Sequence, residues 1–109
     1  MQISGYRCMW VMAMFDLPTD TKVARKRYAQ FRKFLLSDGF TMMQYSVYVR
    51  HCPSEENASV HSHRVERKVP PDGEVRIIIF TDKQFERMQI FWGKTRVATE
   101  SPGGQLELF

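Results

Sequence analysis

The feature that most constrains the fold is an unbroken apolar run at positions 9–15, which ends at Asp16-Leu17-Pro18. A short continuous apolar run bounded by a turn signal is typical of a strand that is buried on both faces. We therefore expect a central strand over residues 8–15. The Asp16 carboxylate at its end is either a cap of the next turn or helix or a functional side chain, and the run alone does not decide between them.

The composition is that of an ordinary globular domain. The chain has 109 residues, of which 43% are hydrophobic and 26% charged, so we expect one folded domain over residues 1–98 and a linker and interaction tail over residues 99–109. No apolar run approaches the roughly 20 residues of a membrane-spanning helix, and no signal-peptide pattern begins the chain. With only Cys8 and Cys52 present, the sequence predicts a reduced, cytoplasmic protein without a membrane partner.

Positive charge is concentrated in the first part of the chain. Residues 1–70 carry eleven Lys and Arg against six acids, whereas residues 71–109 carry five against six, which together give the net charge of +4. A basic region of this kind favours an anionic partner, of which nucleic acid is the commonest. A mildly basic surface without such a partner is the alternative, and the net charge alone supports both equally.

A basic amphipathic helix is predicted over residues 21–36, after turn and N-cap residues at 18–21 and before a left-handed stop at Gly39. Its apolar stripe consists of Ala24, Tyr28, Phe31 and Leu35. Its candidate nucleic-acid-binding cations are Arg25, Lys26, Arg27, Arg32 and Lys33. These cations either form a solvated outer surface or contact the phosphates of a nucleic acid.

The remaining segments complete an alternating order of strands and helices. Strand periodicity fills residues 40–52, with a bend expected around Met43-Gln44, and a polar helix follows over residues 54–68. A Pro-Pro-Asp-Gly turn then leads into a second buried strand over residues 75–81. The sequence therefore predicts an α+β, ferredoxin-like βαββαβ sandwich with an extra C-terminal strand, its helices packed on one face of a mixed sheet.

The extra strand is expected over residues 88–94, and the chain ends in a pentapeptide that alternates polar and apolar side chains. Such a segment can add as an edge strand to another chain, and a frayed terminus is the alternative. The residues with a candidate partner-binding role are Gln105, Leu106, Glu107, Leu108 and Phe109.

Few other side chains have a pattern typical of catalysis. His61 and His63 lie two positions apart and diverge on a helix, so we expect no histidine metal site. The one acid close to Asp16 in sequence is Asp20, which is better explained as a cap. Ser46 is either a phosphate contact or a hydroxyl on the sheet face.

Four segments together resemble a known family. They are the strand end Phe15-Asp16-Leu17-Pro18, the basic helix with Arg25, Arg32 and Phe34-Leu35, the stop at Gly39, and the strand Gln44-Tyr45-Ser46-Val47-Tyr48. At this spacing they resemble CRISPR-associated protein two, the small subunit of the spacer-acquisition machinery, over residues 8–94. The short, basic form of the chain is most similar to members from type II systems.

The resemblance implies a ferredoxin-like homodimer in which the strand-end aspartates of two protomers face each other. Asp16 is the matching residue, and it would be both the catalytic residue and the ligand of Mg²⁺ or Mn²⁺ in phosphodiester hydrolysis of RNA or DNA. A metal of this kind prefers oxygen ligands and activates water. The family also bridges dimers of the CRISPR integrase, CRISPR-associated protein one, with duplex prespacer DNA lying across it.

Three functions follow as hypotheses. The first is an adaptor in CRISPR adaptation that binds duplex prespacer DNA and bridges integrase dimers, without a need for catalysis. The second is a metal-dependent endonuclease that acts through Asp16. The third is a toxin-type ribonuclease of the related virulence-associated family. We favour the adaptor as the cellular role, with nuclease activity as the alternative.

Overall fold

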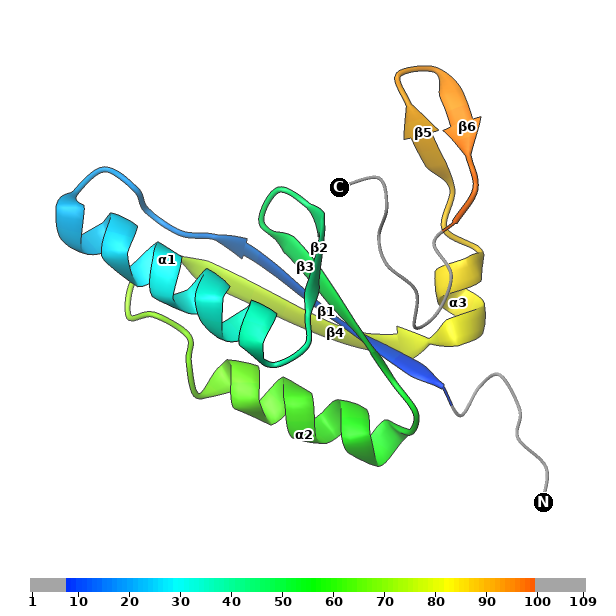
Figure 1. The fold of residues 1–109 in the computed structure, drawn as a ribbon, viewed down its shortest axis with the longest axis horizontal. Helices are drawn as coiled ribbons and strands as arrows, with labels where there is room; N and C mark the ends of the chain where they lie inside the picture. Colours follow the sequence, from blue (N-terminus) through cyan, green and yellow to red (C-terminus); the bar gives the residue numbers. More distant parts are fainter. Residues whose placement is uncertain (1–7, 100–109) are drawn as a thin grey trace.

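The computed structural model describes residues 8–99, which form a four-stranded sheet with two long helices and a separate hairpin (Figure 1). In chain order the elements are β1 (Met9–Asp16), α1 (Lys22–Ser37), β2 (Thr41–Gln44), β3 (Val47–Cys52), α2 (Glu55–Glu66), β4 (Glu74–Thr81), α3 (Asp82–Glu86), β5 (Ile90–Trp92) and β6 (Thr95–Val97). The strand order β2-β3-β1-β4 confirms the ferredoxin-like βαββαβ fold. The sheet is antiparallel at every pairing, so the expectation of a mixed sheet was wrong.

Strand β1 is central, as the apolar run predicts, and it pairs with β3 on one side and β4 on the other. Val11 and Ala13 have no exposed surface and point toward the helices, together with other side chains of the main core. Trp10 and Met12 alternate with them and pack in a second cluster on the opposite face. The strand is therefore buried on both faces and extends one residue beyond the expected end, to Asp16.

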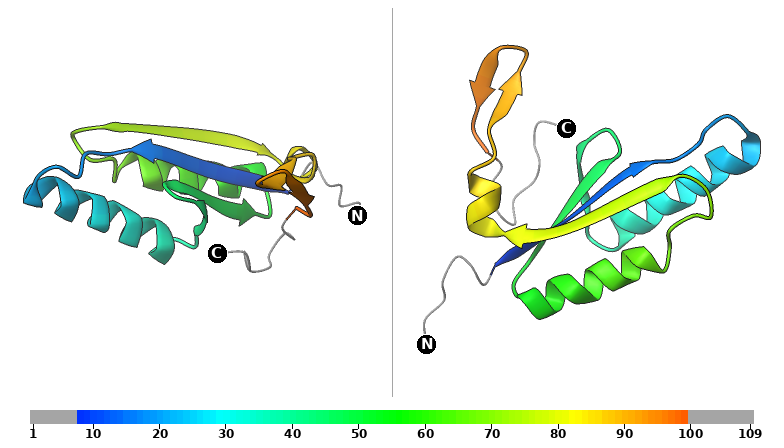
Figure 2. Two further views of the ribbon diagram at one scale, coloured as in Figure 1. Left: turned by 90° about the horizontal axis from the view of Figure 1, so that it is seen from above. Right: turned by 180° about the vertical axis from the view of Figure 1, so that it is seen from behind.

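Helices α1 and α2 cover the same face of the sheet (Figure 2, left). Phe31 and Leu35 of α1 and Val65 of α2 are buried against β1 in the main core. The Thr21 hydroxyl accepts a hydrogen bond from the backbone amide of Ala24 at 3.0 Å, so Thr21, not Asp20, caps α1. The predicted bounds of α1 are thus correct to within one residue.

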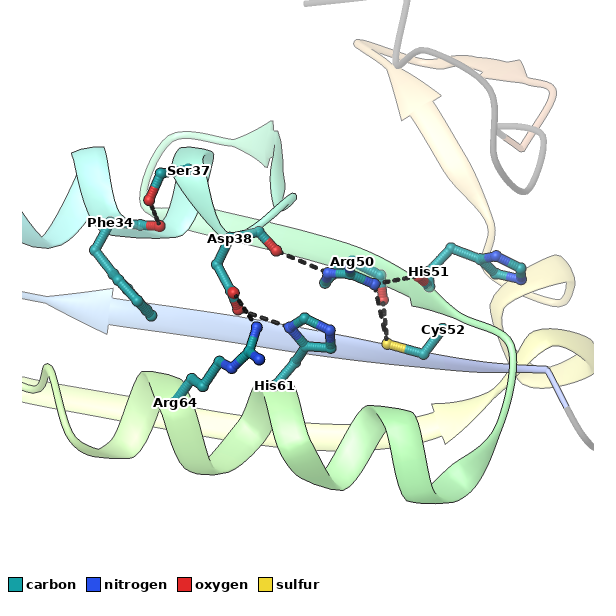
Figure 3. A network of polar contacts seen from close by, with 8 residues as sticks. All are labelled: Phe34, Ser37, Asp38, Arg50, His51, Cys52, His61 and Arg64. Carbon is teal, nitrogen blue, oxygen red and sulfur yellow. Dashed lines mark hydrogen bonds and ion pairs between the residues drawn. The ribbon is translucent and has the colours of Figure 1, made fainter.

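A buried carboxylate joins the end of α1 to its neighbours (Figure 3). Asp38 Oδ2 lies 2.7 Å from His61 Nδ1 of α2, and Arg64 Nη1 donates to Asp38 Oδ1 at 3.0 Å. Arg50 Nε of β3 donates to the Asp38 backbone carbonyl at 2.8 Å, while Gly39 turns the chain with φ 90°. One residue therefore ties two helices and a strand together through charge-assisted hydrogen bonds.

The turn between β2 and β3 lies at Tyr45-Ser46, two residues after the expected bend at Met43-Gln44. Ser46 adopts a left-handed conformation with φ 62°, and its carbonyl accepts a hydrogen bond from Phe15 N at 3.0 Å. Ser46 Oγ lies 2.9 Å from the Tyr28 hydroxyl, so it belongs to a turn and not to the sheet face.

The C-terminal part of the described chain also departs from the expectation. A capping box at Thr81 and Gln84 starts the short helix α3. The single strand expected over residues 88–94 is instead a hairpin of two strands, β5 and β6, which turns at Gly93 with φ 61°. The alternation of apolar residues is real, but the glycine within it marks a turn.

Helix α3 covers one end of the sheet face that α1 and α2 leave open. Phe85 stacks on Trp10 with ring centroids 3.9 Å apart and an interplanar angle of 9°, and Trp10 Nε1 donates to Asp82 Oδ1 at 2.7 Å. At about 3.3 Å per residue, Trp10 and Asp16 are roughly 20 Å apart along β1. The end of this face that carries Asp16 is therefore far from α3.

No helix among residues 8–99 is long and apolar enough to cross a membrane.

The Asp38 contacts give a prediction for stability. Replacing His61 with Leu leaves a nearly buried carboxylate with one side-chain partner fewer, so the free energy of unfolding should fall by about 2 kcal/mol in urea denaturation. His63→Leu is the matched control, because His63 is exposed on the same helix, and its effect should stay within about 0.5 kcal/mol. Equal losses in the two variants would show that the Asp38–His61 contact is not stabilising.

Candidate metal and nucleic-acid site

Asp16 is exposed at the end of the buried strand β1, where the sheet stops being covered. It shares a sheet face with Met14, Met12 and Trp10, because alternate residues of a strand point the same way. This face, opposite α1 and α2, is called the open face below. The side chain of Asp16 makes no hydrogen bond or ion pair with any residue between 8 and 99.

A second acid lies directly across the sheet from Asp16. Glu74, the first residue of β4, is its cross-strand partner, and Arg76 is the partner of Met14. Arg76 donates to both carboxylate oxygens of Glu74, from Nε at 3.1 Å and from Nη2 at 3.4 Å. Sequence analysis missed Glu74 because 58 positions separate it from Asp16, and only the β1–β4 register brings them together.

Gly73 holds the backbone around Asp16 in place. Its φ of 93° is a backbone conformation that glycine adopts readily and other residues rarely adopt. A Cβ built on it would lie 2.7 Å from the Asp16 carbonyl oxygen and 2.8 Å from Leu17 Cδ2. The predicted Pro-Pro-Asp-Gly turn is therefore confirmed, and its glycine is needed for close approach as well as for the turn.

The predicted nucleic-acid-binding cations do not all lie on one surface of α1. At 100° per residue, Lys22, Lys26 and Lys33 fall on the side of the helix opposite its buried residues, with Arg25 and Arg32 beside them. These five residues are called the outer stripe below. All of them are exposed. They run along the solvent side of the helix layer.

Arg27 lies on the other flank of the helix, away from the outer stripe. Its Nη1 is 3.3 Å from Asp72 Oδ2 in the turn before β4, and it borders a hollow of about 380 Å³ with Phe34, Lys68 and Pro70. The Lys68 ammonium sits 5.8 Å from the centroid of the Phe34 ring. This flank of α1 therefore makes contacts within the chain.

The outer stripe and Asp16 belong to opposite sides of the molecule. Figure 2 (left) shows α1 and α2 below the sheet. Asp16 is on the opposite, open face, because the preceding residue Phe15 packs with Phe31 of α1 and alternate residues of a strand point to opposite faces. A straight duplex lying along the outer stripe would thus not reach the carboxylate of the same protomer. Duplex binding and chemistry at Asp16 would use separate surfaces.

The donor atoms available for a metal ion are few. Among residues 8–99 no group of three or more His, Cys, Asp and Glu side chains could hold a metal ion. Asp16 and Glu74 supply hard carboxylate oxygens of the kind that Mg²⁺ and Mn²⁺ prefer, and Arg76 already engages Glu74. The carboxylate of Asp16 fits a divalent cation, but the described residues of one protomer supply too few ligands to hold it. A site shared between two protomers would supply Asp16 twice.

The remaining polar candidates take structural positions. Cys52 is fully buried, and burial raises the pKa of its thiol, so it is a poor nucleophile. His61 is held by Asp38, and His51 Nε2 lies 3.9 Å from Asp82 Oδ1 near α3. The candidate partner-binding residues Gln105, Leu106, Glu107, Leu108 and Phe109 lie outside the described residues.

The contact between Gly73 and Asp16 gives a second prediction. Gly73→Ala combines an unfavourable φ with a clash against backbone, so it should lower the free energy of unfolding by about 3 kcal/mol and displace Asp16. Gly93→Ala is the control, because Gly93 also has a positive φ but a Cβ there meets no atom within 4 Å. Its cost should be about 1 kcal/mol. Thermal and urea denaturation measure both, and equal costs would contradict the role given to the clash.

The family comparison agrees with this geometry. The model of the family described as CRISPR associated protein Cas2 matches residues 9–88, which include Asp16, the outer stripe and Glu74. A solved structure titled "Crystal structure of cas2" superimposes with a TM-score of 0.54 at 24% identity, covering 86% of this chain and 99% of that chain. This likeness supports the fold.

Two curated relatives are similar over nearly their whole length. A protein from Parvibaculum lavamentivorans is 61% identical over 101 residues, which are 93% of this chain and 100% of that protein. A protein from Flavobacterium psychrophilum is 47% identical, over 99% of this chain and 94% of that protein. Both are named "CRISPR-associated endoribonuclease Cas2". The chain therefore belongs to the CRISPR-associated Cas2 family.

Proposed function

We propose that this protein acts in CRISPR spacer acquisition by binding duplex prespacer DNA and bridging dimers of the CRISPR integrase. The observation that carries the proposal is the outer stripe, in which five exposed cations follow one side of a 16-residue helix. Cations arranged in this way neutralise successive phosphates without reading bases, as an adaptor for DNA of any sequence requires.

The proposal includes a homodimer formed through the open face. Ile78 of β4 is 48% exposed there, beside Met12, and α3 covers only the end of this face near Trp10. An apolar sheet face of this kind is normally covered by a partner. A second copy placed on it would bring two Asp16 side chains toward one another and leave both outer stripes exposed on opposite outer surfaces of the dimer.

Charge reversal on the outer stripe tests the adaptor. In the double variant Lys26→Glu, Lys33→Glu the affinity for duplex DNA should fall at least about tenfold, because two phosphate contacts become repulsive. The dependence of the logarithm of affinity on the logarithm of salt concentration should become shallower by about two. Fluorescence anisotropy over a salt series measures both, and spacer acquisition in cells that carry the integrase should be lost.

The matched control is Arg27→Glu, Lys68→Glu, which makes the same change in net charge on the flank that borders the hollow. This control should retain most of the duplex affinity. Equal losses in the two double variants would show that only net charge matters. An unchanged affinity in the outer-stripe variant would show that DNA binds elsewhere.

The second candidate function is a metal-dependent endonuclease acting through Asp16. The observation that favours it is an exposed carboxylate without an ion-pair partner among residues 8–99, at the end of a buried strand. Curated relatives are also named endoribonucleases. A divalent cation, when bound, would supply Lewis acidity and an activated water for phosphodiester hydrolysis. Asp16 would bind and orient that cation, with Asp16 of a second copy completing the pair.

Asp16→Asn tests this candidate. The substitution keeps the shape of the side chain and removes its charge, so Mg²⁺- or Mn²⁺-dependent cleavage of RNA or DNA should fall by about a hundredfold or more. Duplex binding by the outer stripe should be unchanged. The control Asp20→Asn removes an exposed acid four positions along and should leave cleavage intact. Cleavage that survives Asp16→Asn would exclude Asp16 as the metal ligand.

A further inference from the structure

A nucleic acid that reaches Asp16 needs a cation on the open face, because the outer stripe lies on the other side of the sheet. Phosphate must approach a carboxylate there, and like charges repel. In the four strands of the sheet, the Arg residues are Arg50 and Arg76. Arg50 opposes Val11 and points toward the helices, whereas Arg76 opposes Met14 on the open face. Arg76 is thus the cation that the sheet itself provides beside Asp16.

We propose that Arg76 binds a backbone phosphate of the nucleic-acid strand at the Asp16 site and that Glu74 positions Arg76 for this contact. The inference rests on the proposed endonuclease function of Asp16. It assigns to β4 a phosphate-binding residue, and to Glu74 the role of a positioning residue.

The register supports this assignment. Asp16 and Glu74 are direct cross-strand partners, and Arg76 is the diagonal neighbour of Asp16, about 7–8 Å away across the two strands. An arginine side chain is long enough to cover that spacing. The guanidinium can therefore meet a phosphate that also contacts a cation held at Asp16.

The charges fit the same role. Two carboxylates directly opposite each other in a sheet are destabilising, and the two hydrogen bonds from Arg76 to Glu74 offset that repulsion. The two hydrogen bonds to Glu74 align the guanidinium group of Arg76. Hydrogen bonding to Glu74 also raises the pKa of Arg76, so the guanidinium stays charged. An aligned, charged guanidinium group can bind a phosphate through two parallel hydrogen bonds, as it binds a carboxylate.

The exposure of the pair argues against a purely structural role. The Arg76 and Glu74 side chains are 71% and 63% exposed, and ion pairs this exposed contribute little to stability. Charge on an edge strand also prevents edge-to-edge pairing, and β4 is such a strand. A single charge anywhere along β4 would be enough to prevent such edge-to-edge pairing. Instead, Glu74 and Arg76 both lie at the Asp16 end of β4, and the other residues of β4 on the open face are the apolar Ile78 and Phe80.

The experiment measures binding of a single-stranded RNA oligonucleotide in the Asp16→Asn background, where cleavage is suppressed. Adding Arg76→Gln should weaken binding about fivefold. The slope of the logarithm of affinity against the logarithm of salt concentration should become shallower by about one, the value for one lost phosphate contact. Adding Glu74→Gln should also weaken binding, by less than Arg76→Gln does, because the guanidinium loses the carboxylate that aligns it. Arg67→Gln, an exposed arginine at the end of α2, is the control and should have little effect. In the enzyme that retains Asp16, Arg76→Gln should raise KM more than it lowers kcat.

The outcomes separate this inference from the function on which it rests. If Arg76→Gln behaves like Arg67→Gln, the inference is overturned, whatever Asp16→Asn does to cleavage. If Arg76→Gln weakens RNA binding but Asp16→Asn leaves cleavage intact, Arg76 is a phosphate contact and the endonuclease proposal fails. If the protein with no substitution binds neither single-stranded RNA nor single-stranded DNA, both are overturned.

Discussion

The pairing of β1 on both sides is the constraint on which the rest of the molecule depends. A strand with neighbours on both edges and side chains buried on both faces has no polar position until it ends, so its sequence is an unbroken apolar run. Asp16 is the first residue of that strand at which a carboxylate can be solvated. The candidate site lies there because burial ends there, and Gly73 approaches the backbone closely at that point.

Two polar contacts define how the layers sit on β1. Asp38 links α1, α2 and β3 at one end of the helix layer, and Trp10 links α3 to the start of β1 through Asp82. Buried pairs of this kind are strong only when each polar atom has a partner, and they favour one arrangement of the elements. The helix layer is thereby fixed on one face, whereas on the open face Trp10 and Met12 are buried in the second cluster and Ile78 of β4 is exposed.

Local signals in the sequence were sufficient for the elements whose stability is local. The apolar run predicted β1, the capping region at residues 18–21 and the stop at Gly39 bounded α1, although the cap proved to be Thr21 and not Asp20, and the Pro-Pro-Asp-Gly turn was correct. The β2–β3 turn was missed because Ser46 takes a left-handed conformation, and its partners in the structure, Phe15 and Tyr28, are distant in sequence. Asp16 became a candidate from its position after β1 together with the family resemblance, whereas Glu74 and Arg76 depend on a cross-strand register that no local pattern contains.

The separation of the outer stripe from Asp16 changes how the two candidate functions relate. If both were on one surface, DNA binding and cleavage would be two steps of one event, and each substitution would affect both. Here the helix layer and the sheet lie between them (Figure 2, left). A dimer formed through the open face would place its outer stripes outward and its Asp16 side chains inward. The adaptor role therefore needs no access to Asp16, whereas a nuclease needs the substrate to reach the rim of that face, where Glu74 and Arg76 lie.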